Sequence, residues 1–170
     1  LWVVTKNNLR WVRSDLGRSK LVREVTALRC GLDAEMWQDE TTCRTLLGGN
    51  FTKQLANLGG ALPFDLKRSH ALYKALFGEV ETEIAGKRLL IVASGALTQL
   101  PFQVLVTSEP ESKFSPTAYR NAKWLIRDHG LVVLPAASSL RALRISLKNH
   151  AERPFLGIGN PLLEGMDERY

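Results

Sequence analysis

The sequence predicts an α/β fold, a mostly parallel sheet flanked by helices and preceded by an N-terminal β-hairpin and helices. Three short apolar runs, at residues 89–93, 130–134 and 155–158, are typical of buried strands, because they lack the polar alternation of a half-exposed strand. An amphipathic helix is predicted between the last two runs. A strand–helix–strand order of this kind favours parallel strands.

Chain length and the longest apolar run bound the architecture. A chain of 170 residues with 45% hydrophobic residues suffices for one domain or a large part of one. The longest unbroken apolar run, residues 89–93, is far shorter than the roughly 20 residues that a membrane span needs. Since the sequence opens on Leu1 and ends on Tyr170 without the pattern of a natural terminus, we expect a piece of a longer polypeptide.

The first 32 residues predict a hairpin followed by a helix. Residues 1–5 and 9–13 are rich in Trp and Val and flank Lys6-Asn7-Asn8, whose asparagines tolerate left-handed turn geometry. A helix is predicted over 18–32, because four apolar residues share one face: Leu21, Val25, Leu28 and Leu32. On the same helix we expect three charged residues to face water: Arg23, Glu24 and Arg29.

Residues 33–64 carry two Gly-Gly pairs and predict one or two short helices. A clearer helix follows Asp65, which can cap it, and ends at Gly78. Its predicted apolar face consists of Leu66, His70, Tyr73, Leu76 and Phe77. Val80 and Ile84 predict another short helix before Gly86.

The strand at 89–93 is followed by weaker signals. Residues 102–106 predict a second strand or extended segment, 107–118 a surface loop, and 124–126 a brief apolar patch. After the strand at 130–134, Ser138 can cap a helix. That helix would turn Leu140, Leu143 and Leu147 inward.

The net charge of +6 is unevenly distributed. Residues 1–32 carry seven basic and two acidic side chains, whereas residues 33–65 carry two basic and five acidic ones. We interpret the basic region as a solvated face, because basic charge alone is a weak signal for nucleic acid. A nucleic-acid binder would use Arg10, Arg13, Arg18 and Lys20, and we rank this hypothesis third.

Cys30 and Cys43 form neither a CxxC pair nor a disulfide framework, so we expect free thiols in a reducing cytoplasm. Together with His70, His129 and His150 they do not provide the ligand spacing of a zinc site. The sequence therefore predicts no metal and no cofactor.

Ser94-Gly95 supplies the turn at the carboxyl end of the strand at 89–93, where open α/β sheets usually build sites. Ala93-Ser94-Gly95-Ala96 lacks the Gly-x-Ser-x-Gly spacing of a nucleophile elbow. We therefore interpret Ser94 as a turn residue.

Taken in order, several segments resemble the CHAT domain, a caspase-like cysteine peptidase module often attached to tetratricopeptide repeats. The matching segments cover most of the chain: residues 1–4 with 11–12, 72–76, 88–105, 124–126, 134–140 and 156–161. The turn after the first of these strands usually carries Pro-Asp-Gly in the family, and here it is Ala93-Ser94-Gly95.

This resemblance implies a caspase-like fold and a His–Cys dyad, with the His in a His-Gly motif and the Cys in an Ala-Cys motif, each after a strand. The histidine lowers the thiol pKa and then protonates the leaving amine. In the family both motifs lie beyond the segment that matches Gly159-Asn160-Pro161. We therefore expect no catalytic residue in this chain and no activity of the chain alone.

The resemblance also implies the organisation of the chain and its partners. Residues 1–64 would form the N-terminal hairpin and helical region, and residues 65–170 the first part of the caspase-like sheet, with the remainder beyond Tyr170. In a cytoplasmic protein of bacterial type, the partner would be a protein substrate or a regulatory protein, reached through tetratricopeptide repeats outside this chain. We expect neither membrane nor nucleic acid as a partner.

The histidines and cysteines present have simpler interpretations. His129-Gly130 spells the family pair but precedes a strand, so we expect a surface-loop histidine. His70 lies on an apolar helix face, and His150 ends a basic helix, where it interacts favourably with the helix dipole. Arg44 would lower the pKa of Cys43, and a dyad of Cys43 with a histidine is the minor alternative.

A non-catalytic interaction scaffold is the rival from another class. A partial sheet leaves one strand unpaired, and an unpaired edge can pair with another chain. Self-association through an exposed sheet edge is therefore the prediction of this second hypothesis.

Overall fold

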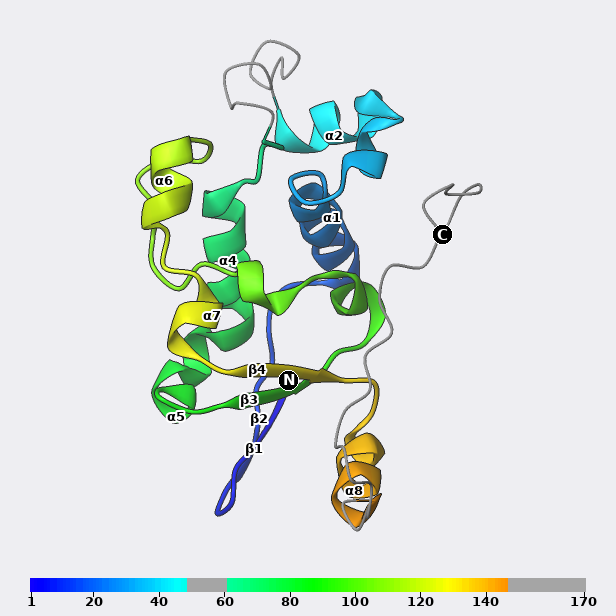
Figure 1. Ribbon diagram of the computed structural model, residues 1–170, viewed down its shortest axis with the longest axis vertical. Helices are drawn as coiled ribbons and strands as arrows, with labels where there is room; N and C mark the ends of the chain where they lie inside the picture. The colour runs from blue at the N-terminus through cyan, green and yellow to red at the C-terminus, as the bar shows by residue number, and fades with distance from the viewer. Residues whose placement is uncertain (49–60, 147–170) are drawn as a thin grey trace, which may run out of the picture. The chain divides into compact units, whose positions relative to one another are not determined.

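Two small sheets and a series of short helices make up residues 1–48 and 61–146, the part of the chain that this computed structural model describes (Figure 1). Residues 1–135 form one unit. Residues 136–170 form a second unit, whose described part is the helix α8, Ala137–Ser146.

The first two strands pair antiparallel, as the sequence predicts. Strand β1, Trp2–Val4, and strand β2, Leu9–Trp11, align Trp2 with Trp11 and Val4 with Leu9. The amide of Thr5 donates to the carbonyl of Asn8 at 2.8 Å and closes the turn. We call this pair of strands the N-terminal ribbon.

Helix α1, Arg18–Arg29, confirms the predicted helix but ends three residues earlier. Val25 and Leu28 are buried as expected, whereas Leu32 lies beyond the helix and is 40% exposed. The prediction that Glu24 faces water is wrong, because its carboxylate lies 2.6 Å from the Arg68 guanidinium in the space between two helices.

After α1 the chain forms the 3-10 helix η1, Ala34–Trp37, and helix α2, Glu40–Leu47. Asp33 and Asp39 begin these elements, and their side chains accept hydrogen bonds from the amides of Glu35 and Thr41. Short helices were predicted in this region, and α2 and η1 confirm that expectation.

Helix α4, Leu66–Phe77, begins at its predicted cap. The Asp65 carboxylate accepts the amide of Arg68 at 3.0 Å. The 3-10 helix η2, Gly78–Val80, and helix α5, Glu81–Ile84, follow it, and Val80 and Ile84 are both buried. The predicted start and end of α4 are therefore confirmed, and Leu66, Tyr73 and Phe77 are buried as expected. His70 and Leu76 are only half-buried, and the buried Leu72 was missing from the predicted face.

Strands β3, Leu89–Val92, and β4, Leu131–Leu134, pair in parallel, which confirms the predicted parallel arrangement for these two strands. Leu89, Ile91 and Leu131 pack against the core. Leu90 and Val92 are 46% and 49% exposed. Within residues 1–135 the described elements cover one face of the pair, so cover of the second face stays a prediction.

The connection from β3 to β4 differs from its prediction at residues 102–106. After the 3-10 helix η3, Gly95–Gln99, residues 102–104 form the 3-10 helix η4, Phe102–Val104, instead of a strand, and the backbone is extended only at the end of the range, at Leu105. Pro101, at the start of η4, has no N–H to donate to a strand ladder. A single bridge between Val106 and Trp124 is the β-pairing found there.

Two helices complete this connection. Helix α6, Pro116–Asn121, begins inside the predicted surface loop, capped by the Ser115 hydroxyl, which accepts the amide of Ala118. Helix α7, Leu125–Asp128, takes up most of the predicted apolar patch and buries Leu125. The serine–proline pair at the start of α6 was a usable helix signal.

The described residues of 1–135 contain two clusters of buried hydrophobic side chains, a smaller one around Cys30 and Cys43 and a larger one that joins early and late parts of the chain. Val12, Val25 and Leu28 share the larger cluster with Leu66 and Leu105, so side chains from the first 64 residues pack directly on later ones. The N-terminal ribbon and α1 are thus part of the same core as α4.

In the second unit, α8 begins at Ala137, so Ser138 lies within its first turn and the predicted cap position is wrong. The predicted strand at 155–158 and His150 lie outside the described residues.

Candidate functional site

A sharp turn follows the carboxyl end of β3. Ser94 is extended, with φ −138° and ψ 158°, and Gly95 follows at φ 56°. That left-handed value favours glycine, because an L side chain there meets the following carbonyl. The Thr98 hydroxyl donates to the Gly95 carbonyl at 2.8 Å, so the turn leads directly into η3.

A cleft of about 470 Å³ lies between α1 and this turn. It is lined by Arg18, Leu21, Val22, Val25, Thr26, Ser94, Gly95, Ala96 and Gln99. Arg29 of α1 donates to the Gln99 side chain of η3 at 3.1 Å. An apolar wall with polar groups around it suits an extended peptide or one large side chain.

The serine–glycine pair after the apolar run indicated Ser94 at this edge, but nothing in the sequence indicated the α1 side of the cleft. Helix periodicity showed which face of α1 is apolar, and packing decided that this face lies opposite Ser94. Among the described residues that line the cleft there is no histidine, so none of them offers Ser94 an imidazole base. The interpretation of Ser94 as a turn residue agrees with this geometry.

His70 of α4 is partly buried, and the backbone holds its ring. Its Nδ1 lies 3.0 Å from the Val106 carbonyl, and its ring stacks on Tyr73 with centroids 6.4 Å apart. Burial, and then the negative charge of Glu81, raise the pKa of the Tyr73 phenol to about 12. The Tyr73 phenol is therefore neutral at ordinary pH and does not act as a base.

His129 is buried, 8% exposed, which corrects the prediction of a surface-loop histidine. Its Nδ1 lies 2.9 Å from the Lys87 carbonyl, because the residues just before β3 and β4 run side by side in the parallel pair. His129 precedes β4, as predicted, so it lies at the amino end of the strands. Ser94 and the cleft lie at the opposite end.

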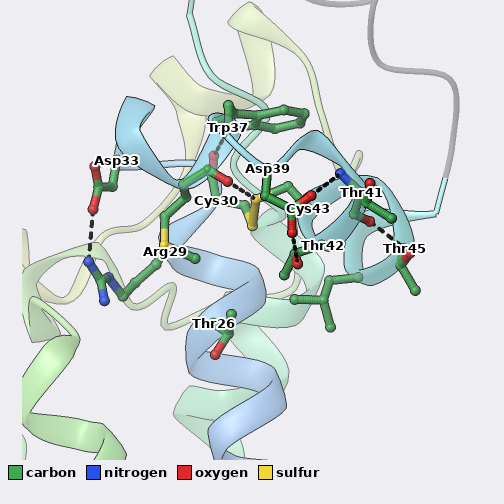
Figure 2. Close-up of a disulfide and its surroundings, with 12 residues drawn as sticks. Thr26, Arg29, Cys30, Asp33, Trp37, Asp39, Thr41, Thr42, Cys43 and Thr45 are labelled. Atoms are coloured by element: carbon green, nitrogen blue, oxygen red, sulfur yellow. Dashed lines mark hydrogen bonds and ion pairs between the residues drawn. A yellow bond between two sulfur atoms is a disulfide. The ribbon is translucent and has the colours of Figure 1, made fainter.

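The two cysteines form a disulfide, which corrects the prediction of free thiols (Figure 2). Cys30 ends α1 and Cys43 lies in α2, with Cα atoms 5.7 Å apart and both residues fully buried. The Trp37 indole donates to the Cys30 carbonyl at 2.6 Å, just beside the bridge. A separation of 13 residues has no sequence signature, so only the packing of α2 on α1 shows this pairing.

This disulfide has two consequences for the site. Neither sulfur carries a thiol, so the alternative of a Cys43–His dyad is excluded in this oxidised form. The free-thiol argument for a reducing compartment also fails, because disulfides are typical of oxidising ones. A cytoplasmic location stays a prediction.

The described residues contain no group of three His, Cys, Asp or Glu side chains that could hold a metal ion. Within the same ranges, no helix is long and apolar enough to cross a membrane. Of the four cations named for nucleic acid, Arg10 is neutralised within the protein, since its guanidinium lies 2.5 Å from the Glu83 carboxylate.

Comparison with protein families finds a match in this chain. The family model described as CHAT domain matches residues 66–168, which begins at the first residue of α4 and includes both strands of the parallel pair. Neither the curated proteins nor the solved structures include a significant match.

Proposed function

This chain belongs to the CHAT domain family, and we propose that it forms the N-terminal part of a CHAT cysteine peptidase domain without supplying the catalytic dyad. The match over residues 66–168 carries the proposal. In the family, the His–Cys dyad follows strands that come after the segment present here.

The disulfide between Cys30 and Cys43 supports the proposal that this chain does not supply the nucleophilic thiolate. A cysteine peptidase attacks with a thiolate, and the chain has two cysteines in all. Both are fully buried and joined to each other at the end of α1. A disulfide sulfur has no proton to lose and no thiolate to offer, so we assign Cys30 and Cys43 a structural role.

The parallel pair supports the role of a scaffold. In a parallel sheet all carboxyl ends lie at one edge, so groups that follow further parallel strands come to the edge where Ser94 lies. The cleft between α1 and η3 opens at that edge. We propose that it holds part of the protein substrate beside a dyad supplied by the rest of the domain.

The test compares two proteins, the chain of 170 residues and the longer protein that contains it. Each is treated with a peptide-based electrophile that labels catalytic thiolates, without reductant, and the labelled residue is mapped by mass spectrometry. We expect labelling in the longer protein alone, at a cysteine outside this chain. Labelling of Cys30 or Cys43 would contradict the proposal.

A second pair of variants of the longer protein separates catalysis from scaffolding. The double substitution Cys30→Ala with Cys43→Ala should lower stability and leave the activity of the folded protein in place. Val22→Arg should raise KM more than it lowers kcat, because it adds a long side chain to one wall of the cleft. The control is Ile126→Arg, at an exposed position outside the cleft.

A non-catalytic interaction scaffold is the alternative, and the exposed face of β3 and β4 favours it. Leu90, Val92 and Val132 are each at least 40% exposed. Apolar strand faces of this kind favour association with another chain. Dimerisation measured by light scattering, independent of salt and lost in Leu90→Thr with Val92→Thr, would support this alternative, and a monomer would exclude it.

A further inference from the structure

The outer face of the N-terminal ribbon is apolar and exposed. Trp2, Val4, Leu9 and Trp11 are 66%, 74%, 62% and 58% exposed. The register places Trp2 opposite Trp11 and Val4 opposite Leu9, so all four lie on one face of the two strands. We call this set the ribbon patch.

The opposite face holds the ribbon to the body of residues 1–135. Val3 and Val12 pack against the core. Arg10 pairs with Glu83 at 2.5 Å, and its guanidinium also donates to the Glu79 carbonyl at 3.3 Å. The inner face is therefore fully used, and in Figure 1 the turn of the ribbon projects beyond the neighbouring elements.

The ribbon patch is a contiguous apolar surface, unlike the single exposed apolar residues that are common on proteins. Two indoles stand beside each other with ring centroids 6.4 Å apart. Each indole alone can bury about 150–250 Å², and monomers rarely leave more than a few hundred Å² of contiguous apolar surface in water. Patches rich in tryptophan are common at the centre of binding surfaces.

The charged side chains of the ribbon segment itself are all positive. Residues 1–14 contain no acidic side chain and three basic ones, Lys6, Arg10 and Arg13. Arg10 is already paired with Glu83, whereas Lys6 and Arg13 are exposed, one at each end of the ribbon. Among the described residues, no carboxylate lies within ion-pair distance of these two cations.

We propose that the ribbon patch binds an extended acidic segment of another protein, which adds as a third strand. Among the described residues the ribbon has two strands, so each has an outer edge with unpaired backbone groups. Alternate apolar side chains of the segment would cover the indoles and the Val4–Leu9 pair. Acidic side chains at its two ends would lie beside Lys6 and Arg13.

Geometry sets the spacing of the bound segment. From the level of Arg13 to that of Lys6 the ribbon covers roughly six residues, or about 20 Å at 3.3 Å per residue. The segment should therefore carry acidic residues about six positions apart, with apolar residues at two alternate positions between them.

Area argues against a second copy of this chain as the occupant. A stable interface buries about 800 Å² per partner, which four side chains on two strands of three residues each do not provide. A narrow peptide strand needs less surface, because backbone hydrogen bonds along the edge contribute to its affinity.

The experiment measures binding of a panel of fluorescein-labelled peptides to the full 170-residue chain by fluorescence anisotropy. The first set has Glu at both ends and Ile, Val or Phe at the two alternate inner positions. A matched set has Lys at both ends, and a third set has Ser at the inner positions. We expect binding of the first set alone, and affinity that falls as salt is raised.

Variants locate the binding surface. Trp11→Ser and Trp2→Ser should each weaken binding at least about tenfold, because central indoles carry much of the energy of such contacts. Lys6→Glu should weaken it several-fold. Ile126→Ser and Lys67→Glu, exposed positions on α7 and α4, are the matched controls and should change nothing. Circular dichroism verifies that each variant is folded.

Several results would overturn the proposal. One is that no peptide of the first set binds at about 1 mM. Another is that the Lys-ended peptides bind as tightly as the Glu-ended peptides of the first set. Tighter binding to vesicles that contain phosphatidylglycerol, or to oligothymidylate, would assign the ribbon patch to a membrane or to nucleic acid. Concentration-dependent dimerisation abolished by Trp11→Ser would assign it to a second copy. None of these results depends on peptidase activity, so the proposed function can fail separately.

Discussion

Loss of the buried disulfide should lower the stability of this chain measurably. Cys30 and Cys43 are 13 residues apart, and the bridge closes a loop of that length in the unfolded chain. Closure of a loop of about 15 residues stabilises the folded state by about 3 kcal/mol, chiefly because the unfolded chain loses conformations. We therefore expect the reduced chain to be less stable by about 3 kcal/mol.

In a chain of this size, 1 kcal/mol shifts Tm by about 2–4 °C, so reduction should lower Tm by roughly 6–12 °C. The measurement is urea and thermal unfolding followed by circular dichroism, with and without a dithiol reductant. The variant Cys30→Ala with Cys43→Ala is the control, since its unfolding should not respond to reductant.

Two results would refute this reasoning. One is alkylation of both cysteines in the denatured chain without prior reduction, which would mean that the bridge does not form. The other is unfolding of the oxidised and reduced chains at the same urea concentration, which would mean that the closed loop contributes nothing.

Three further predictions concern packing, charge and pH. Gly31→Ala should destabilise the fold by about 1–3 kcal/mol in urea unfolding, because a Cβ there would lie 2.4 Å from the Cα of Phe64. Glu24→Gln should cost about 1–3 kcal/mol in the same assay, because it leaves the largely buried Arg68 guanidinium without its carboxylate at 2.6 Å. Stability should fall from pH 10 to about pH 12 in urea unfolding at stepped pH, because the unfolded Tyr73 phenol ionises at 10.0 while burial holds the folded pKa at about 12. Below pH 10 this contribution is present in full, and in Tyr73→Phe the decline through that window should be smaller.

Local sequence signals sufficed where a residue acts on its own segment. Asp65 caps α4 through the amide three residues on, and the Gly78 position ends the helix, so both boundaries could be predicted. The same signals failed at residues 102–106, where apolar composition suggested a strand. There the buried Phe102 belongs to a 3-10 turn. Whether an apolar segment forms a strand or a turn depends on whether another strand lies beside it, and local sequence does not show that.

The candidate site was predictable on one side only. Ser94 and Gly95 mark the turn after β3 from sequence alone, since a serine–glycine pair ends an apolar run. Arg18 and Val22 line the opposite wall because α1 packs against η3, and helix periodicity does not say which element a face meets.

The α/β class, the parallel strands that begin at Leu89 and Leu131, the cap at Asp65 and the family could all be predicted from the sequence, because each depends on short-range pattern or on motif order. Tertiary structure alone decided that Cys30 meets Cys43, that His129 is buried against Lys87, and that Glu24 faces Arg68. Each of these joins residues through the packing of separate elements, and the free energy of such contacts depends on distances in space that sequence spacing does not encode.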